Sequence, residues 1–419
     1  MHYSVYFSDS GWHLSGVNTF TANLIGALRE RDIDARLVTT GALAPGDKQL
    51  ARPTGIPADA LHLGPAARLR GQRNEQSFAR VDHLRKFLEA RAPCVYVPNY
   101  DFEYSYVSGQ LSPRVAVLGI VHSDDPEHYR HAAQLGRTWN AAVGVSRAIG
   151  ERLRRFLPDC ADRIEVIRYG VAVPAVDPPR CRRPDGCLRL VYVGRIIEQQ
   201  KRVSDLVCIA RELKERRIDF HLSFIGDGPE RGNLTGQLAD LIAQGLVTFE
   251  GILPADCISA RLQQADALLL TSAFEGLPLT LLEAMACGCV PIVSDIRSGI
   301  PELVRHGING FRVPLGDIEA YVDSIARLQS SKPLRQQLSQ AAYEEIRRQE
   351  LSISTAAERY AALLDRIIAE ARQQTFVRLP VPIVPSRYRR DQPGWRGHVP
   401  APVRHLAGRV MGIQRSQTS

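Results

Sequence analysis

The sequence predicts an α/β protein with two parallel, doubly wound sheets, one in each half of the chain. Its 419 residues exceed what one ordinary hydrophobic core accommodates. Apolar runs of strand length alternate with stretches of helical periodicity, which is the pattern of strand–helix–strand units. Near the middle, residues 174–187 contain four prolines and read as a linker. We therefore expect two domains, over residues 1–173 and 188–350.

The first domain begins with a strand, a loop containing Gly11 and Gly16, a helix and a second strand, the start of a doubly wound sheet. Residues 41–76 are rich in Gly, Pro and Arg and predict no clear element. The predicted strands cover residues 2–7, 35–39, 95–97, 115–121, 141–145 and 164–167, and the predicted helices cover 18–30, 81–90 and 149–156.

The second domain alternates more regularly, which predicts a parallel sheet. One more strong helix, over residues 355–372, follows after this sheet is complete. We expect the segment 351–375 to cross back and pack on the first domain. The predicted strands of the second sheet cover residues 188–193, 220–225, 247–250, 267–270 and 290–293, and the helices cover 203–216, 255–264, 278–286 and 317–328.

The composition is that of a soluble globular protein, with 44% hydrophobic and 23% charged residues. No apolar run approaches the roughly 18 residues that a membrane span needs, and the first residues lack the pattern of a signal peptide. The eight cysteines include no Cys-x-x-Cys pair. We therefore expect reduced, structural thiols and a cytoplasmic location.

Residues 376–419 form a basic, proline-rich tail. Eight arginines and one aspartate give it a net charge of +7, which leaves +1 for the rest of the chain. Arginines interleaved with Tyr388 and Trp395 suit an anionic lipid surface, so peripheral contact at the inner face of the membrane is one hypothesis. The other is that the tail lies along the first domain. Nucleic-acid binding is not expected, because the body is nearly neutral.

The sharpest functional signal is the segment that follows the strand over 267–270, the end at which open parallel sheets bind ligands. Gly276 allows a backbone to approach a ligand without the obstruction of a Cβ. Pro278 suits the start of a helix whose free N–H groups attract an anion. Glu283 is ionisable among apolar neighbours, and a buried carboxylate needs a partner. Paired sugar hydroxyls would supply one, and a solvated or salt-bridged glutamate is the alternative.

Two cations form the second signal. Arg195 and Lys201 lie in the loop after the first strand of the second domain. Fixed cations can bind a diphosphate when no metal does so. Loops often carry such residues without a function, so this pair alone is a weak indication.

Together these residues resemble the retaining GT-B glycosyltransferases of the large family-four type, the glycosyl transferases group 1 of bacterial polysaccharide and glycolipid biosynthesis. The resemblance runs through the second half and is looser in the first, where it rests on Gly16-Val17, His122 and Ser146. Departures are Ser15 before Gly16, Ala172 in a turn and Ser298 before Gly299. The matching pattern is Gly194-Arg195 with Lys201, Ile225-Gly226-Asp227-Gly228-Pro229, Glu275 with Glu283, Gly299-Ile300-Pro301-Glu302 and Gly307-Ile308-Asn309-Gly310.

The resemblance implies two Rossmann-like domains that face each other across a cleft, and it implies roles for single residues. Arg195 and Lys201 would bind the donor diphosphate, helped by the backbone of Gly16. Glu283 would bind the nucleotide ribose. His122 would lie beside the transferred sugar, although a lone histidine at a strand end is often structural. Glu275 and the backbone of Gly276, Leu277, Pro278 and Leu279 would hold the donor sugar and its phosphates, so His122 and Glu275 are the candidate catalytic residues.

The implied reaction is a metal-independent, hexosyltransferase-type transfer from a nucleoside diphosphate sugar to a hydroxyl of a carbohydrate or lipid-linked acceptor, with retention. The nucleoside diphosphate sugar is a co-substrate, and no cofactor is expected. No residue stands out as a covalent nucleophile, which favours attack on the same face of the sugar. The alternatives are a sugar-nucleotide epimerase on a related fold, a nicotinamide oxidoreductase and a non-catalytic scaffold.

Two other motifs are expected to be unrelated to the function. Asp32-Ile33-Asp34 resembles a metal-binding Asp-x-Asp but lies at a helix-to-strand turn. Gly226-Asp227-Gly228 begins like a dinucleotide-binding loop, and Glu250 lies at a tempting distance. The next glycine, Gly232, comes one residue too late for that spacing.

Overall fold

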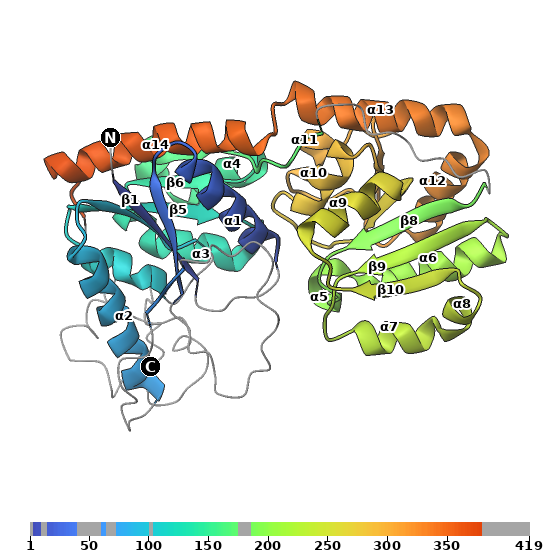
Figure 1. Cartoon of the computed structure of the whole chain (residues 1–419), viewed down its shortest axis with the longest axis horizontal. Helices are drawn as coiled ribbons and strands as arrows, with labels where there is room; N and C mark the ends of the chain where they lie inside the picture. Colours follow the sequence, from blue (N-terminus) through green and yellow to red (C-terminus); the bar gives the residue numbers. More distant parts are fainter. Residues whose placement is uncertain are drawn as a thin grey trace, which may run out of the picture.

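The computed structural model describes residues 3–9, 15–39, 60–63, 73–99, 104–174 and 186–378. Two parallel sheets lie beside each other, each covered by helices, and two long helices near the C-terminus run along one side of both (Figure 1). We refer to the two sheets with their helices as the N-terminal and the C-terminal unit. The predicted α/β class with two doubly wound sheets is confirmed. The predicted linker falls largely outside the described residues.

The first sheet is parallel throughout its described strands, which pair in the order β3-β2-β1-β4-β5-β6-β7. These strands are β1 (Ser4–Asp9), β2 (Asp34–Thr39), β3 (Leu61–His62), β4 (Cys94–Val97), β5 (Val115–Val121), β6 (Ala141–Gly144) and β7 (Ile164–Val166). The order reverses between β1 and β4, and open sheets bind ligands at such a switch point. Every residue of β5 is buried, as expected for a strand covered on both faces.

The second sheet repeats this topology, with its described strands in the order β10-β9-β8-β11-β12-β13. These strands are β8 (Leu188–Val193), β9 (Phe220–Ile225), β10 (Val247–Gly251), β11 (Ala267–Leu270), β12 (Val290–Ser294) and β13 (Phe311–Val313). All pairs are parallel. The switch point lies between β8 and β11, so the loops after these two strands are where a ligand is expected.

Amphipathic helices cover both sheets. In the N-terminal unit they are α1 (Gly16–Arg29), α2 (Arg73–Glu89), α3 (Pro126–Leu135) and α4 (Arg147–Phe156). In the C-terminal unit the longer ones are α6 (Val203–Glu215), α9 (Ala255–Gln264), α10 (Leu279–Ala286), α12 (Ile318–Ser330) and α13 (Lys332–Arg348). Shorter helical turns are α5 (Glu198–Lys201), α7 (Arg231–Gln237), α8 (Ala239–Ala243) and α11 (Ile300–Leu303).

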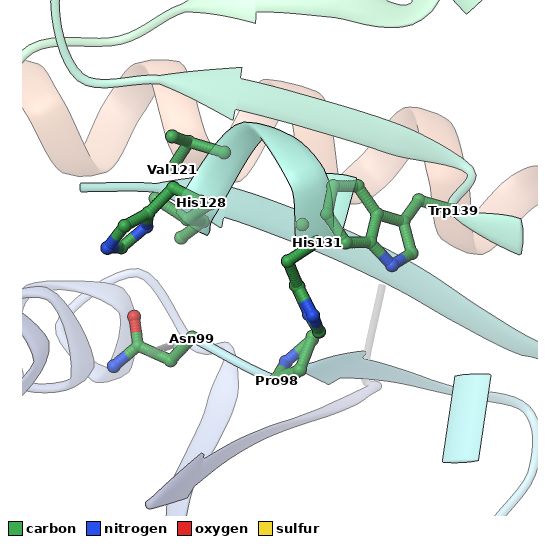
Figure 2. Close-up of a pocket in the computed structure, with 8 residues that line it drawn as sticks. Pro98, Asn99, Val121, His128, His131 and Trp139 are labelled. Carbon is green, nitrogen blue, oxygen red and sulfur yellow. The ribbon is translucent and has the colours of Figure 1, made fainter. Parts of the chain in front are cut away.

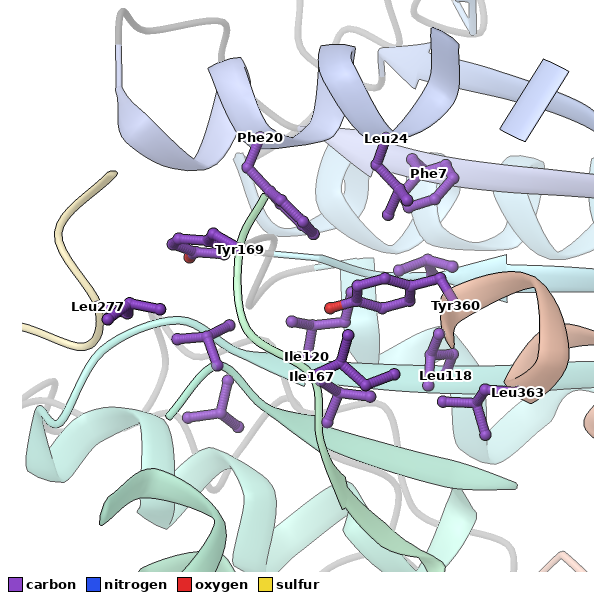
Figure 3. Packing of buried hydrophobic residues seen from close by; sticks show 14 of the residues in the cluster. Phe7, Phe20, Leu24, Leu118, Ile120, Ile167, Tyr169, Leu277, Tyr360 and Leu363 are labelled. Atoms are coloured by element: carbon purple, nitrogen blue, oxygen red, sulfur yellow. The ribbon is translucent and has the colours of Figure 1, made fainter. Parts of the chain in front are cut away.

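The last helix, α14 (Ile353–Gln373), returns to the N-terminal unit and packs on α1, β4 and β5. Its Tyr360 and Leu363 lie in one cluster with Phe20, Leu118 and Ile120 (Figure 3). The predicted crossing of the C-terminal helix is confirmed. Leu277, from the loop after β11, joins the same buried cluster, so both units contribute to one core.

Several described elements escaped the sequence analysis. Helix α3 buries His128 and Tyr129 as well as Ala132 and Leu135, so its inner face does not read as an apolar stripe. Helix α13 buries Ser339 and Glu345 beside its apolar residues. Strand β13 is only three residues long, too short for a periodic signal. Tertiary contacts, rather than local pattern, determine these elements.

The start of the predicted tail lies on the N-terminal unit. Arg378 donates five hydrogen bonds of 2.7–3.2 Å, to the carbonyls of Thr138, Leu111, Ser112 and Val115 and to Oδ1 of Asn140. Burial lowers the pKa of Arg378 to about 10, so the side chain stays charged at neutral pH. Residues 379–419 lie outside the described part of the chain. No described helix is long and apolar enough to cross a membrane.

Candidate active site

The two units meet where the C-terminal ends of β5 and β11 come together. Ser123, two residues beyond β5, forms an isolated antiparallel bridge with Gly276. The Asp124 amide donates to the Glu275 carbonyl at 3.4 Å. A Cβ built on Gly276 would lie 2.0 Å from the His122 carbonyl oxygen. Glycine is therefore required at this contact between the two units, whereas the sequence analysis expected Gly276 to let the backbone approach a ligand.

Glu275 and Lys201 form an ion pair at this junction. Oε1 of Glu275 accepts from Nζ of Lys201 at 2.5 Å, and the side chains are 8% and 13% exposed. The Thr271 hydroxyl, just after β11, donates to the Lys201 carbonyl at 2.8 Å and holds α5 in place. The sequence assigned these two charges to different parts of a donor, and the structure places them on each other. Without a ligand each charge is neutralised by the other.

Arg195 remains exposed at the same edge. Its Nη2 donates to Oε1 of Gln200 at 3.0 Å, and it forms no ion pair with the described residues. The buried Tyr192 hydroxyl donates to the Arg195 carbonyl at 2.6 Å, which fixes the backbone beneath the exposed guanidinium. Arg195 thus offers a positive charge to an anion at this edge.

Two helices begin next to each other across the junction. Gly16 is the first residue of α1 and Leu279 the first of α10, and a Cβ on Gly16 would lie 3.5 Å from the Leu279 Cβ. The first amides of a helix lack partners within it and carry the positive end of its dipole. The two helix starts thus favour one anion between the units. Pro278 occupies the N-cap of α10, so this helix starts one residue later than predicted.

Glu283 lies on α10 as a half-buried carboxylate without a protein partner. It makes no side-chain hydrogen bond or ion pair with the described residues, and its chain neighbours Leu282 and Ala284 are buried. Burial raises the pKa of Glu283 to about 7. The alternative of a salt-bridged glutamate therefore finds no support in the described part of the chain. A ligand with hydroxyl donors would satisfy the carboxylate.

His122 is buried and bonded through both ring nitrogens. Its Nδ1 lies 2.6 Å from the Tyr169 hydroxyl, and its Nε2 lies 2.8 Å from Oδ1 of Asn99. Asn99 Nδ2 donates to Thr21, whose hydroxyl donates to the Val17 carbonyl.

This chain of bonds fixes the protonation of the ring. Thr21 uses its proton on a helix carbonyl, so it accepts from the Asn99 amide, and Oδ1 of Asn99 must then accept from Nε2–H of His122. Nδ1 is left to accept from the Tyr169 hydroxyl. Burial lowers the pKa of His122 to about 3, so the ring is neutral. Both ring nitrogens of His122 are engaged, so neither can take up a proton from a substrate in this arrangement.

Several residues of the site escaped the sequence analysis. Asp124 accepts from the Tyr129 hydroxyl at 2.5 Å and from Arg152 at 3.1 Å, and Arg297 of the C-terminal unit lies 3.9 Å away. Asn99, Tyr169, Tyr192 and Thr271 also belong here. Asn99, Asp124, Tyr169 and Thr271 lie within three residues of the C-terminal end of a strand, and this position is the signal that could have identified them.

The two unrelated motifs have structural explanations. Asp34 pairs with Arg36 at 2.7 Å. No group of three or more His, Cys, Asp or Glu residues that could hold a metal occurs among the described residues. A Cβ on Gly226 would lie 1.9 Å from the Gly194 carbonyl, so this glycine permits the loops after β8 and β9 to pack. Glu250 is paired with Arg261 at 2.5 Å.

Comparison with known proteins gives a consistent result. Residues 179–345 match the family model of glycosyl transferases group 1. Over 232 residues the chain is 33% identical to a putative colanic acid biosynthesis glycosyltransferase of Escherichia coli, covering 54% of this chain and 56% of the relative. Over 210 residues it is 35% identical to a lipopolysaccharide 1,6-galactosyltransferase of Salmonella typhimurium, covering 49% and 56%. The chain thus spans about half the length of these curated relatives.

Solved structures share the whole fold. The Anabaena protein HepE in complex with UDP-glucose matches with a TM-score of 0.69 and 20% identity, over 87% of this chain and 99% of that one. The pneumococcal O-GlcNAc transferase GtfA with UDP and GlcNAc matches with 0.71 and 14%, over 88% and 99%. The chain is therefore a GT-B protein. Its residues 179–345 are similar to the glycosyl transferases group 1.

Proposed function

We propose that this protein transfers a glycosyl group from a nucleoside diphosphate sugar to a hydroxyl acceptor, with retention at the anomeric carbon. The observation that carries the proposal is the meeting of Lys201, Glu275 and two helix starts at the junction of the two units. This junction joins positive charge to a carboxylate that can accept from sugar hydroxyls. Relatives that are glycosyltransferases by name support the reaction class.

The positive groups would stabilise the leaving diphosphate. Negative charge develops on this group as the glycosidic bond breaks, and preorganised donors at that position lower the barrier. Arg195 is exposed and unpaired by carboxylates in the described part of the chain, while the starts of α1 and α10 supply backbone donors. No metal or cofactor is needed in this proposal, because fixed cations and helix dipoles do the work.

Donor binding would exchange the partners of the buried ion pair. Lys201 would turn from Glu275 to the diphosphate, and the released carboxylate would accept from hydroxyls of the donor sugar. The exchange keeps both charges compensated, which matters because an uncompensated buried charge is costly. Glu283 would accept from the ribose hydroxyls at the other end of the donor.

His122 would hold a fixed position beside the transferred sugar and would not transfer a proton. Both ring nitrogens are engaged, and the ring is neutral. The proton of the acceptor hydroxyl would therefore pass to the leaving phosphate on the same face of the sugar. This route needs no covalent nucleophile and yields retention.

The acceptor would be a carbohydrate or a lipid-linked carbohydrate in polysaccharide or glycolipid assembly, at the cytoplasmic side of a membrane. The names of the relatives support this class of pathway. The basic tail would supply peripheral contact with anionic lipid, although the sequence of 379–419 is the basis for this part of the proposal.

A thermal-shift screen with UDP-, GDP-, ADP- and dTDP-sugars tests the donor, because a ligand that binds the folded state raises the melting temperature. The donor that raises the melting temperature is then incubated with the protein and hydroxyl acceptors. NMR of the product determines its anomeric configuration. An inverted product contradicts retention. Consumption of the donor without an acceptor and without a glycoside product would instead indicate an epimerase.

A further inference from the structure

A small cavity lined by both polar and apolar groups lies in the N-terminal unit between α3 and the ends of β4 and β5. Its free volume is about 10 Å³, room for about one water molecule or one hydroxyl group. Figure 2 shows the rings of His128 and His131 extending from α3 toward Asn99 and Pro98. Trp139, which follows α3 and packs on Gly119, closes the other side.

Trp139, which lines the cavity, has a buried hydrogen-bond donor without an acceptor among the described residues. Trp139 is 3% exposed, and its Nε1 has no partner among the described residues. Figure 2 shows this nitrogen on the ring edge toward His131, and the two ring centres are 6.3 Å apart. Leaving a buried N–H unpaired costs about 1–3 kcal/mol. An oxygen placed in the cavity would remove this cost.

The lining selects an uncharged group. No Arg or Lys belongs to the lining residues, so a phosphate or carboxylate would be buried without compensation. His128 is 4% exposed, and burial lowers its pKa to about 4, so it is neutral. His131 shares a hydrogen bond of 2.6 Å with the Ser105 hydroxyl. A hydroxyl suits such a site, because it donates to one neighbour and accepts from another.

The cavity shares a wall with the candidate active site. Asn99 lines the cavity and also accepts from Nε2 of His122 at 2.8 Å. Val121, another lining residue, directly precedes His122. The cavity and His122 are therefore neighbours, with Asn99 and Val121 between them.

We propose that the cavity receives one hydroxyl or hydroxymethyl group of the acceptor sugar, whose oxygen accepts from Nε1 of Trp139. The small volume admits such an arm and excludes a sugar ring. The inference rests on the proposed function, because it assigns an acceptor subsite to the same reaction. It makes Trp139 and His131 residues that select the acceptor, separate from the residues that bind the donor.

The indole N–H of Trp139 is a direct probe of this contact. The chain has three tryptophans, so the ¹⁵N–¹H spectrum of indole-labelled protein has few resonances, and Trp139→Phe assigns the one of interest. Methyl α-D-glucopyranoside, methyl α-D-galactopyranoside and methyl α-D-mannopyranoside are titrated with and without UDP. We expect at least one to shift the Trp139 resonance saturably, and its 6-deoxy analogue to shift it less. If none of the three shifts it, the cavity holds only a water molecule and the proposal is wrong.

Kinetics separate this subsite from the donor site. Trp139→Phe keeps an aromatic ring but removes the N–H, and should raise the acceptor KM about three- to tenfold, the value of one neutral hydrogen bond. The donor KM and the thermal shift by the donor should not change. Tyr360→Phe is the matched control, because it also removes a buried polar atom without a partner in the described residues. A parallel rise of both KM values in Trp139→Phe would mean a packing role and overturn the proposal. Absence of any donor shift in the wild type would instead count against the proposed function.

Discussion

At the scale of single residues, the ion pair of Lys201 and Glu275 joins the loops that follow β8 and β11. The two residues stand 74 positions apart in the chain. The sequence indicated that both contact a donor, but not that they contact each other. Only the sheet order, which sets β8 beside β11, brings the two loops together. The hydrogen-bond partners of His122 could not be predicted either, because Asn99 and Tyr169 follow different strands. Side-chain chemistry is local in the sequence, whereas the geometry of the site is not.

The ion pair predicts a non-additive mutant cycle. Lys201→Ala leaves the Glu275 carboxylate buried without compensation, so it should lower donor affinity and turnover together. Adding Glu275→Gln should cost less than the sum of the single changes, with a coupling of about 1–3 kcal/mol. Donor titration and turnover of the folded variants measure the cycle. Arg195→Ala is the control. It should weaken donor binding by about 1.5–3 kcal/mol, and its effect should be additive with that of Glu275→Gln. Additivity of Lys201→Ala with Glu275→Gln would contradict an exchange of partners.

Glu283 predicts a pH dependence of stability. Its pKa rises from 4.5 to about 7 on folding, so the folded protein keeps a proton that the unfolded chain releases. This contribution to stability is fully present below about pH 4.5 and is lost as the pH rises to about 7. Glu283→Gln should therefore gain in melting temperature relative to wild type between pH 5 and 7. A difference that stays constant over this range would show that the carboxylate is not buried in the folded protein.

The same group predicts that donor binding releases a proton. An ionised carboxylate accepts from ribose hydroxyls, so donor affinity should increase with pH up to about 7. Calorimetry at pH 6.5 in buffers of different ionisation enthalpy measures the released proton. Glu283→Gln should abolish the proton release and weaken donor binding, while a substantial turnover remains at saturating donor. Proton release that persists in this variant would assign it to another group.

At the scale of elements, strands and amphipathic helices could be predicted where the apolar pattern is regular. The strands of both sheets other than β3 and β13, and helix α14, follow from that pattern. Helices α3 and α13 did not, because they bury His128, Ser339 and Glu345 on faces that read as polar. The loop after β11 is a special case. The residue type of Gly276 indicated a close approach to a ligand, and the structure shows that Gly276 is also needed for the contact with the His122 carbonyl.

Gly276 predicts a severe local effect of one added methyl group. Gly276→Ala places a Cβ 2.0 Å from a backbone oxygen, which cannot yield as a flexible side chain would. The loop that carries Gly276 must then move away from the segment after β5. Because misplacing catalytic groups by about 1 Å can lower the rate about a hundredfold, kcat/KM should fall by about two orders of magnitude or more. Gly232→Ala, on α7 with nothing within 4 Å of the added atom, is the control and should keep full activity. Equal activities of the two variants would mean that the junction is not part of the catalytic arrangement.

At the scale of the whole molecule, the N-terminal unit is completed by helix α14 and Arg378, which come after the C-terminal sheet in the sequence. Helix α14 covers its sheet, and Leu277 of the C-terminal unit enters the same buried cluster. The crossing helix could be predicted, because a strong helix remained after the second sheet was complete. The anchor beyond it could not, since Arg378 stood among the basic residues of a tail and nothing local marks the carbonyls that receive it.

The contacts of Arg378, which anchor the start of the tail, predict that substitution of this residue lowers stability. Arg378 uses all five donors of its guanidinium on neutral oxygens, in a half-buried position. Arg378→Ala should lower the free energy of unfolding by at least about 1.5–3 kcal/mol, the value of one charge-assisted hydrogen bond. Arg378→Lys should not restore it, because an ammonium cannot reproduce the planar fork. Denaturant unfolding measures both variants, and wild-type stability in Arg378→Ala would contradict the anchor.

The position of this anchor also decides how the tail must be tested for membrane binding. A chain cut before Arg378 would lose stability and membrane contact together, so the informative truncation ends at Arg378. The removed residues 379–419 carry seven arginines and one aspartate, a net charge of +6. Each basic residue near an anionic surface contributes about 1 kcal/mol, and salt screens this attraction. Full-length protein should therefore sediment with phosphatidylserine-containing vesicles at low salt and lose this binding as salt rises, whereas the truncated chain should stay in solution with an unchanged melting temperature. Equal sedimentation of the two proteins would move any membrane contact from the tail to the folded body.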